Sequence, residues 1–283
     1  PTFEPSYLTG FLDMVNIAFI GGGAMAEAMI KGIISSSLAK PDNISVSDID
    51  ESRCRYLTNQ YRIFATTINS TVLEGTDILV LAVKPQNLQS VASEIRDLLN
   101  PNKLVISILA GTRMETLTDS LNHQSVIRVM PNTPAQVGAG ISLWLCSSNI
   151  NPKDASIVQS ILQTFGQELR VEDEQYIDMA TALSASGPAY VLSFLESMVD
   201  AGVHIGLPRE TARFLTIQTV LGSCALVEQT GQHFAELRDM VTSPGGTTAE
   251  ALLALEQSKF RSTIINAVIA AYQKSITLGG KQS

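Results

Sequence analysis

Residues 15–26 read VNIAFIGGGAMA, an apolar run that ends in a glycine triplet and continues into residues that favour a helix. The spacing is Gly21-x-Gly23-x-x-Ala26. Gly21 permits a tight turn, Gly23 lets the backbone approach a pyrophosphate, and Ala26 lets the helix pack closely on the strand. N–H groups at the start of that helix would face the phosphates. The predicted dinucleotide-binding loop comprises Gly21, Gly22, Gly23, Ala24, Met25 and Ala26.

A glycine triplet also fits an ordinary strand-to-helix turn, so the pattern around it has to decide the fold. Apolar runs of strand length alternate with amphipathic segments through the first half of the chain. Runs of this kind, rich in Val and Ile, are typical of a parallel sheet covered on both faces. They predict an α/β, doubly wound, Rossmann-type domain over residues 14–173. The predicted strands are Val15 to Ile20, Ile44 to Asp48, Asp77 to Val83, Lys103 to Leu109, Val126 to Met130 and Ile141 to Cys146.

After about Val171 the pattern changes to successive long helical segments, which predict an all-α C-terminal domain over residues 174–283. The segment from Pro208 to Gln229 carries apolar residues around most of its circumference. One face on its own subunit cannot bury them all, and the remaining residues are too few to surround the helix. We therefore expect dimerisation through this domain. The other predicted helices are Ala189 to Ile205, Thr247 to Glu256 and Arg261 to Thr277.

Composition excludes several classes of function. The 283 residues carry a formal net charge of -8 and no dense basic run, which argues against nucleic acid as a partner. Three scattered cysteines suit a reducing compartment, so we expect a cytoplasmic protein. The three histidines form no ligand pair, and a metal site is not expected. No transmembrane helix is predicted, and residues 1–13, which do not resemble a secretory signal, are expected to be a leader or an added extension.

The end of the second predicted strand bears on the choice of cofactor. Asp48 would accept hydrogen bonds from a ribose 2′-OH and repel a 2′-phosphate, which favours NAD. Ser47 could instead donate to a phosphate, and Arg53 or Arg55 could neutralise one. An alternative is that Asp48 or Asp50 merely caps the next helix.

Two further strand ends carry candidate residues. Ala82, Val83, Lys84 and Pro85 follow the strand that ends near Leu81, at the edge of the sheet where open α/β folds bind ligands. A lysine at a helix start is disfavoured unless an anion lies nearby, so Lys84 is a candidate for cofactor or substrate. Met130, Pro131 and Asn132 begin a loop stiffened by two prolines, which could hold these residues against a planar ring.

Five motifs together resemble the pyrroline-5-carboxylate reductase family in order and spacing, from Met14 to about Thr277. They are Gly21-x-Gly23-x-x-Ala26, Ala82-Val83-Lys84-Pro85-Gln86, Met130-Pro131-Asn132-Thr133-Pro134, Ser186-Gly187-Pro188-Ala189-Tyr190 and Val241-Thr242-Ser243-Pro244-Gly245-Gly246-Thr247-Thr248. The last resembles the family's signature, whereas the first is shared with many dehydrogenases. One departure is Ala185, where the family often has glycine.

The resemblance implies an oxidoreductase of proline biosynthesis that reduces the C=N bond of 1-pyrroline-5-carboxylate to give L-proline. By resemblance, NADPH is the favoured cofactor, and Asp48 leaves NADH open. The substrate carboxylate would bind Ser243, Pro244, Gly245, Gly246, Thr247 and Thr248, where glycine N–H groups and hydroxyls can hold an anion. Thr248 would lie beside the imine nitrogen and donate or relay a proton, unless a bound water does so. Lys84 is the second catalytic candidate.

The resemblance also implies a homo-oligomer, either a dimer or a pentamer of dimers, in which the 243–248 segment of one subunit covers the nicotinamide of the other. Two alternatives stay open. A β-hydroxyacid-type dehydrogenase uses a lysine of its helical domain as acid, but between Ala180 and Phe260 the only lysine is Lys259. A non-catalytic nucleotide-binding sensor would have no evident use for the 243–248 segment.

Overall fold

The computed structural model describes residues 15–280, so the expected leader at residues 1–13 lies outside the described residues. Two compact units are present. The first comprises residues 15–186 together with 271–280, and the second comprises residues 187–270. None of the helices between residues 15 and 280 is long and apolar enough to cross a bilayer.

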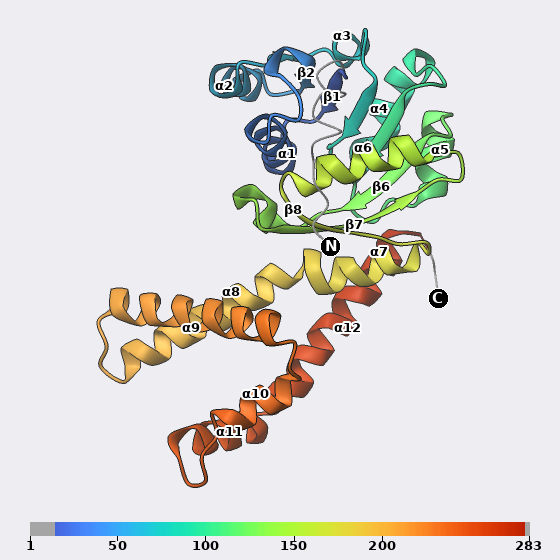
Figure 1. The fold of residues 1–283 in the computed structure, drawn as a ribbon. Coiled ribbons are helices and arrows are strands. Elements are labelled where there is room, and N and C mark those ends of the chain that lie inside the picture. Colours follow the sequence, from blue (N-terminus) through green and yellow to red (C-terminus); the bar gives the residue numbers. More distant parts are fainter. Residues whose placement is uncertain (1–14, 281–283) are drawn as a thin grey trace. The chain divides into compact units, whose positions relative to one another are not determined.

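An eight-stranded sheet forms the centre of the first unit, in the order β3-β2-β1-β4-β5-β6-β7-β8 (Figure 1). The first six strands are parallel to one another, in the doubly wound order that places a ligand crevice beyond the carboxyl ends of β1 and β4. Their bounds are β1 Ile17–Ile20, β2 Ile44–Ser47, β3 Phe64–Thr66, β4 Ile78–Leu81, β5 Leu104–Ser107 and β6 Val126–Met130. The predicted fold class is confirmed.

The far edge of the sheet differs from the prediction. β7 (Gly140–Cys146) pairs antiparallel with β6, and β8 (Gly166–Arg170) pairs parallel with β7. The expectation of an all-parallel sheet is therefore wrong at this edge. The connection from Met130 to Gly140 is too short for a crossover helix, so β7 can only return antiparallel. The sequence analysis missed β3 and β8 because both are short and half-exposed, and neither is a continuous apolar run.

Helices cover both faces of the sheet, as the apolar strands require. One face packs against α1 (Ala24–Ser35), α2 (Glu51–Tyr61) and α6 (Pro152–Gln163), and this core contains Phe19, Met29 and Trp144. The other face packs against α3 (Asn69–Leu73), α4 (Leu88–Ile95) and α5 (Met114–Leu121). These two apolar layers fix the strand ends that carry the candidate residues.

After β8 the chain is helical. α7 (Gln175–Ala180) continues through a π-helical turn at Thr181–Ala185. The long helices are α8 (Gly187–His204), α9 (Arg209–Thr230) and α12 (Phe260–Leu278), with the shorter α10 (Phe234–Met240) and α11 (Thr247–Gln257) between them. α8, α9, α11 and α12 correspond to the four predicted helices within two residues at each end, whereas α7 and α10 were not predicted.

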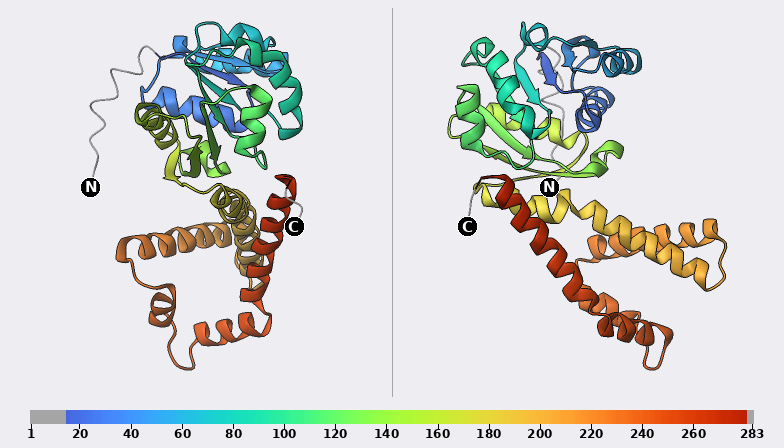
Figure 2. Two further views of the ribbon diagram at one scale, coloured as in Figure 1. Left: turned by 90° about the vertical axis from the view of Figure 1, so that its right-hand side faces the viewer. Right: turned by 180° about the vertical axis from the view of Figure 1, so that it is seen from behind.

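The second unit buries very little of its apolar surface. Helices α8 and α9 lie side by side (Figure 2). Gly202 faces Ala212 where these two helices touch. Of residues 187–270, only Ala212, Thr216 and Leu237 are buried. On α9, Phe214 and Leu221 are 64% and 59% exposed. A helical unit this open lacks a core of its own, because a stable fold has to remove such surface from water.

Candidate functional site

The glycine loop has the geometry that a phosphate-binding turn needs. Gly21 has a φ of 98°, and a Cβ atom there would lie 2.6 Å from the carbonyl oxygen of Ala82, so the position requires glycine. Gly23, by contrast, has a φ of -65°, and a Cβ atom there would meet nothing within 4 Å. It is exposed to open space, as a position beside a ligand has to be.

The start of α1 leaves room for an anion. Gly23 is the N-cap and supplies no side-chain cap to the first turn of the helix. Ala26 is fully buried against the sheet, so the helix lies close to β1. Ala24 is exposed and Met25 is half-buried at the same end. The residues present thus fit a pyrophosphate at this helix terminus, because its first N–H groups have no partner within the helix.

Asp48 is joined directly to the glycine loop. Its Oδ2 atom accepts a hydrogen bond from the Gly22 N–H at 2.7 Å, and its Oδ1 atom accepts one from the Asp50 N–H at 3.0 Å. The N-cap of α2 is Asp50, whose carboxylate accepts from the N–H groups of Ser52 and Arg53. Hydrogen bonding to Ser52 lowers the pKa of Asp50. The two acids therefore have different roles, and Asp48 is not the helix cap.

Ser47 does not offer its hydroxyl to a ligand. The side chain is fully buried, and its Oγ donates to Asn69 Oδ1 at 2.7 Å. This differs from the expectation that the Ser47 hydroxyl donates to a phosphate, because strand β2 turns this side chain into the sheet. Asn69 in turn donates to Glu94 at 2.7 Å. The hydroxyl holds α3 to β2 instead.

A polar cluster that sequence reasoning missed lies between α1 and α2. Arg53 donates through Nε to the carbonyl oxygen of Gly22 at 2.5 Å and pairs with Glu27 through a terminal nitrogen. Tyr56 and Tyr61 both donate their hydroxyls to Glu27 Oε1, at 2.9 and 2.8 Å. No spacing rule signals this cluster, since its members come from two helices that meet only in the fold.

Electrostatics fix the charge states of this cluster. Burial acts to raise the pKa of Glu27, but hydrogen bonds from Arg53, Tyr61 and Tyr56 outweigh it, and the pKa lies below its usual value. Burial and the hydrogen bond to Glu27 raise the pKa of Tyr61. The hydrogen bond to Glu27 likewise raises the pKa of Tyr56. At neutral pH the carboxylate is charged and both phenols are neutral donors.

The carboxyl end of β4 lies at the same edge of the sheet as the glycine loop, because β1 and β4 are parallel neighbours. The Ala82 N–H donates to Ile20 O at 2.8 Å, which places Ala82 and the half-buried Val83 beside Gly21. Lys84 follows, exposed, as the N-cap of a short 3-10 helix that begins at Pro85. These four residues lie where they were expected, at a strand end next to the glycine loop.

Met130, Pro131 and Asn132, which begin the loop after β6, are buried. Met130 packs in an apolar cluster with Leu145 and Ile177. Asn132 Nδ2 donates to Ser184 O at 3.2 Å, and its Oδ1 accepts from the Ile141 N–H at 3.0 Å. Asn132 thereby ties the loop after β6 to β7 and to the π-helical turn. Its side-chain amide is committed to the protein itself.

An ion cluster lies at β6, the strand that precedes this loop, and sequence analysis missed it as well. Arg128 on β6 is 1% exposed and pairs with Glu174 at 2.6 Å and with Asp178 at 3.5 Å. Arg113 pairs with the same two acids, at 4.0 and 3.6 Å, and donates to Gly279 O at 2.7 Å. The cluster anchors α7 and the end of α12 to the sheet.

The 243–248 segment belongs to the second unit and is described by itself. It forms a turn in which Gly245 has a φ of 68° and the Gly246 N–H donates to Ser243 O at 3.0 Å. This differs from the expectation that Gly246 offers its N–H to a ligand. Helix α11 begins directly after, at Thr247, with Gly246 as N-cap. Ser243, Pro244, Gly245 and Thr247 are exposed, and Thr248 is half-buried.

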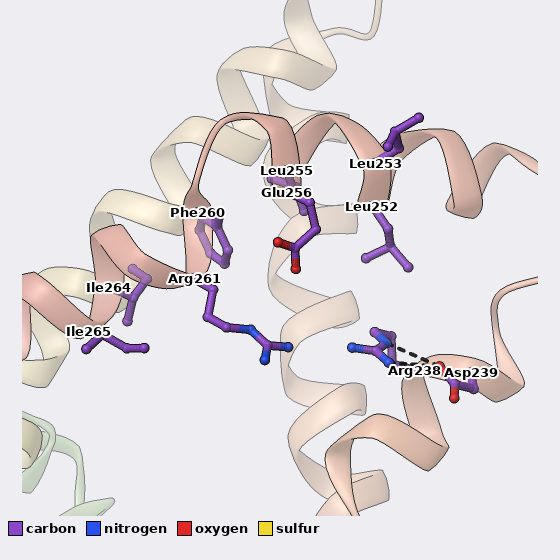
Figure 3. A pocket seen from close by; sticks show the side chains of 10 residues that line it. All are labelled: Arg238, Asp239, Leu252, Leu253, Leu255, Glu256, Phe260, Arg261, Ile264 and Ile265. Carbon is purple, nitrogen blue, oxygen red and sulfur yellow. Dashed lines mark hydrogen bonds and ion pairs between the residues drawn. The ribbon is translucent and has the colours of Figure 1, made fainter.

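The second unit also contains a groove of about 610 Å³ between α10, α11 and α12 (Figure 3). Its walls are mostly apolar, and the charged residues at its rim include the adjacent pair Arg238 and Asp239. None of residues 243–248 lines it. The apolar lining residues are Leu252, Leu253, Leu255, Phe260, Ile264 and Ile265.

Comparison with known proteins gives consistent matches. A family model described as pyrroline-5-carboxylate reductase dimerisation matches residues 174–278, and one described as NADP oxidoreductase, coenzyme F420-dependent, matches residues 16–111. Pyrroline-5-carboxylate reductase of Synechocystis is 39% identical over 267 residues, which cover 94% of this chain and 99% of that protein. The enzyme of the same name from Escherichia coli is 40% identical over 260 residues, covering 92% and 96%.

Solved structures agree with these matches. Plasmodium falciparum pyrroline carboxylate reductase with NADP bound superposes with a TM-score of 0.88 at 34% identity, covering 95% of this chain and all of that one. The pyrroline-5-carboxylate reductase of Coxiella burnetii gives 0.86 at 34% identity, with the same coverage. A ketol-acid reductoisomerase at 14% identity, with a TM-score of 0.63, shares the fold alone.

Proposed function

The chain belongs to the pyrroline-5-carboxylate reductase family, and from this premise we propose that it reduces the C=N bond of 1-pyrroline-5-carboxylate to give L-proline. The observation that carries the proposal is the identity to reductases of that name over more than nine-tenths of the chain. It is an oxidoreductase that uses a nicotinamide cofactor, which supplies the hydride. The residues described above would bind the cofactor and the substrate, orient them, and donate or relay the proton to the imine nitrogen.

The first unit would hold the cofactor. The backbone of Gly22 and Gly23 and the first turn of α1 would bind the pyrophosphate, since the space beside Gly23 is open. Ala82 and Val83 would line the nicotinamide side of the crevice, next to Gly21. Lys84 would lie at the rim of the crevice and attract the anionic cofactor or substrate. Asn132 would act indirectly, by holding the loop that closes the crevice beyond β6.

The second unit would bind the substrate through residues 243–248. The carboxylate would accept hydrogen bonds from Ser243 and from N–H groups at the start of α11, where the helix terminus favours an anion. The substrate's protonated iminium is a far better hydride acceptor than the neutral imine, so the site needs only to bind the cation and hold its carbon in line. Thr248 would place its hydroxyl beside the imine nitrogen.

We propose NADPH as the favoured cofactor, with NADH also used. The NADP-bound relative from Plasmodium supports the first part. The position of Asp48 supports the second, because its carboxylate lies at the β2 end, where it can accept from ribose hydroxyls.

The family's dimerisation domain and the open second unit both indicate a homo-oligomer. We propose a dimer in which a second copy covers the apolar surface of α9 and the groove shown in Figure 3. A pentamer of such dimers is the larger assembly that the family resemblance implies. We further propose a cytoplasmic location, which suits three cysteines that form no disulfide.

Oxidation of NADPH and of NADH, each measured with and without 1-pyrroline-5-carboxylate, tests the function. We expect oxidation that depends on the pyrroline and proceeds faster with NADPH. A β-hydroxyacid dehydrogenase would leave both cofactors unoxidised with this substrate while it oxidised a hydroxyacid. A nucleotide sensor would bind the cofactor and turn over with neither. Either result would overturn the proposed function.

A further inference from the structure

The side chain of Arg53 is committed to the protein at three points. It projects from the first turn of α2, five residues after Asp48, and its Nε atom donates to Gly22 O at 2.5 Å. A terminal nitrogen pairs with Glu27, and the guanidinium lies 5.0 Å from the ring centre of Tyr56. Gly22 also donates its own N–H to Asp48. A carboxylate and a guanidinium therefore hold the N–H and the C=O of one loop residue, Gly22.

Glu27 is itself held in place and kept charged. Besides Arg53 it accepts the hydroxyls of Tyr56 and Tyr61, and these hydrogen bonds keep its pKa below the usual value. Its side chain is 21% exposed and that of Arg53 is 25% exposed, so water screens the pair only in part. Moving Arg53 away would leave a half-buried carboxylate without its cation, which is costly.

This arrangement affects how the protein distinguishes the two nicotinamide cofactors. They differ only in a 2′-phosphate, and a site selects that phosphate by placing a free cation near the end of β2. Here that place holds Asp48, whose charge repels a phosphate, while Arg53 on the adjoining helix is neutralised by Glu27. A bound 2′-phosphate would have to compete with Glu27 for the guanidinium.

We infer that Glu27 is a specificity-determining residue, which limits the preference for NADPH over NADH by binding Arg53. The inference rests on the proposed function only in that a nicotinamide cofactor binds the Gly21–Ala26 loop. Arg55 is no substitute, because it is 67% exposed and paired with Glu51 on the solvent side of α2. Removing the charge of Glu27 would make Arg53 available to the 2′-phosphate and would strengthen NADPH binding.

Calorimetric titration of the full-length protein with NADPH and with NADH tests this inference. Glu27→Gln keeps the size of the side chain and removes its charge. We expect the ratio of the NADH to the NADPH dissociation constant to rise about fivefold, the size of one partly screened charge pair, mostly through tighter NADPH binding. In an Arg53→Gln background the same change should leave the ratio where it is, because the effect acts through Arg53.

Glu51→Gln is the matched control, since it removes one carboxylate from an arginine pair of the same helix and should not move the ratio. Tyr61→Phe is the second variant, usable if Glu27→Gln fails to fold. It removes one of the donors that hold the Glu27 carboxylate in place, so Glu27 should hold Arg53 at least as firmly and the ratio should stay the same or fall. A ratio that does not rise in Glu27→Gln, or that rises in Tyr61→Phe, would overturn the inference. A fall in Glu27→Gln would in addition show that Glu27 orients Arg53 for the phosphate.

The readout separates this inference from the proposed function. Binding of the two cofactors is measured without 1-pyrroline-5-carboxylate, so a protein that shows the predicted shift yet reduces no pyrroline would overturn the function alone. Normal reduction of the pyrroline with no shift in the ratio would overturn the inference alone. A protein that binds neither cofactor would overturn both.

Discussion

Gly23 faces open space at the start of α1, in an extended conformation with a φ of -65° that any residue can adopt. Gly23→Val should therefore leave the fold intact and block the approach of the pyrophosphate. We expect cofactor affinity to fall by about tenfold or more, roughly 1.4 kcal/mol or above, in a calorimetric titration. Thermal unfolding provides the control and should change little. Unaltered affinity would remove the Gly21–Ala26 loop from the site.

Asp48 and Asp50 can be separated by one pair of variants, because only Asp50 caps α2. Asp48→Ser removes the charge that repels a 2′-phosphate, and we expect the ratio of NADPH to NADH specificity constants to rise. Asp50→Ser replaces one good N-cap with another and should leave that ratio unchanged. Equal effects of the two substitutions would mean that Asp48 acts only through the structure of the loop.

Among the secondary-structure elements, α7 and the end of α12 depend on the buried ion cluster for their attachment to the sheet. Asp178 is 4% exposed and faces Arg113, Arg128 and Ser275. Asp178→Ala should lower the free energy of unfolding by about 3 kcal/mol or more, because it leaves Arg113 and Arg128, whose charges are largely buried, with Glu174 as their one remaining carboxylate. The midpoint of thermal or urea unfolding measures the loss.

Asp200 provides the matched control for that prediction. It pairs with Arg209 at 2.9 Å between α8 and α9, but both side chains are about 60% exposed. Asp200→Ala should therefore cost about 1 kcal/mol at most. If the two variants lost equal stability, the cluster at Arg128 would contribute no more than a surface pair.

For the whole molecule, the question is whether one subunit suffices for an active site. The first unit carries the proposed cofactor-binding loop and the second carries residues 243–248, and the resemblance implies that each site takes these two parts from different subunits. Gly23→Val and Thr248→Ala subunits, each impaired alone, should then regain activity when mixed into heterodimers, since one site of each dimer receives both intact halves. Turnover of NADPH with 1-pyrroline-5-carboxylate is the measurement.

Thr248→Ala alone should lose about a hundredfold in turnover if the hydroxyl is the general acid, and much less if it only orients the substrate. For the mixing experiment, co-purification through two different tags shows that heterodimers have formed. Absence of rescue in proven heterodimers would rule out a shared site. It would not argue against the proposed reductase function.

The sequence alone was sufficient to predict the doubly wound sheet, the glycine loop and the helices α8, α9, α11 and α12. These features depend on local patterns: apolar runs with period two or unbroken, helical stretches with period 3.6, and glycines at a strand-to-helix turn. The order of the motifs was also sufficient to predict the family. Shorter elements such as β3 and β8 were missed because their polar, half-exposed residues carry no period.

Only the tertiary structure decided what the side chains at the strand ends do. It turned Ser47 into the sheet, committed the Asn132 amide to Ile141 and Ser184, and joined Asp48 to Gly22. It also brought Glu27 of α1 to Arg53 of α2. Such partners are 9 to 52 residues apart in the chain. Their contact depends on which strands become neighbours and how the helices pack, and no local sequence pattern indicates either.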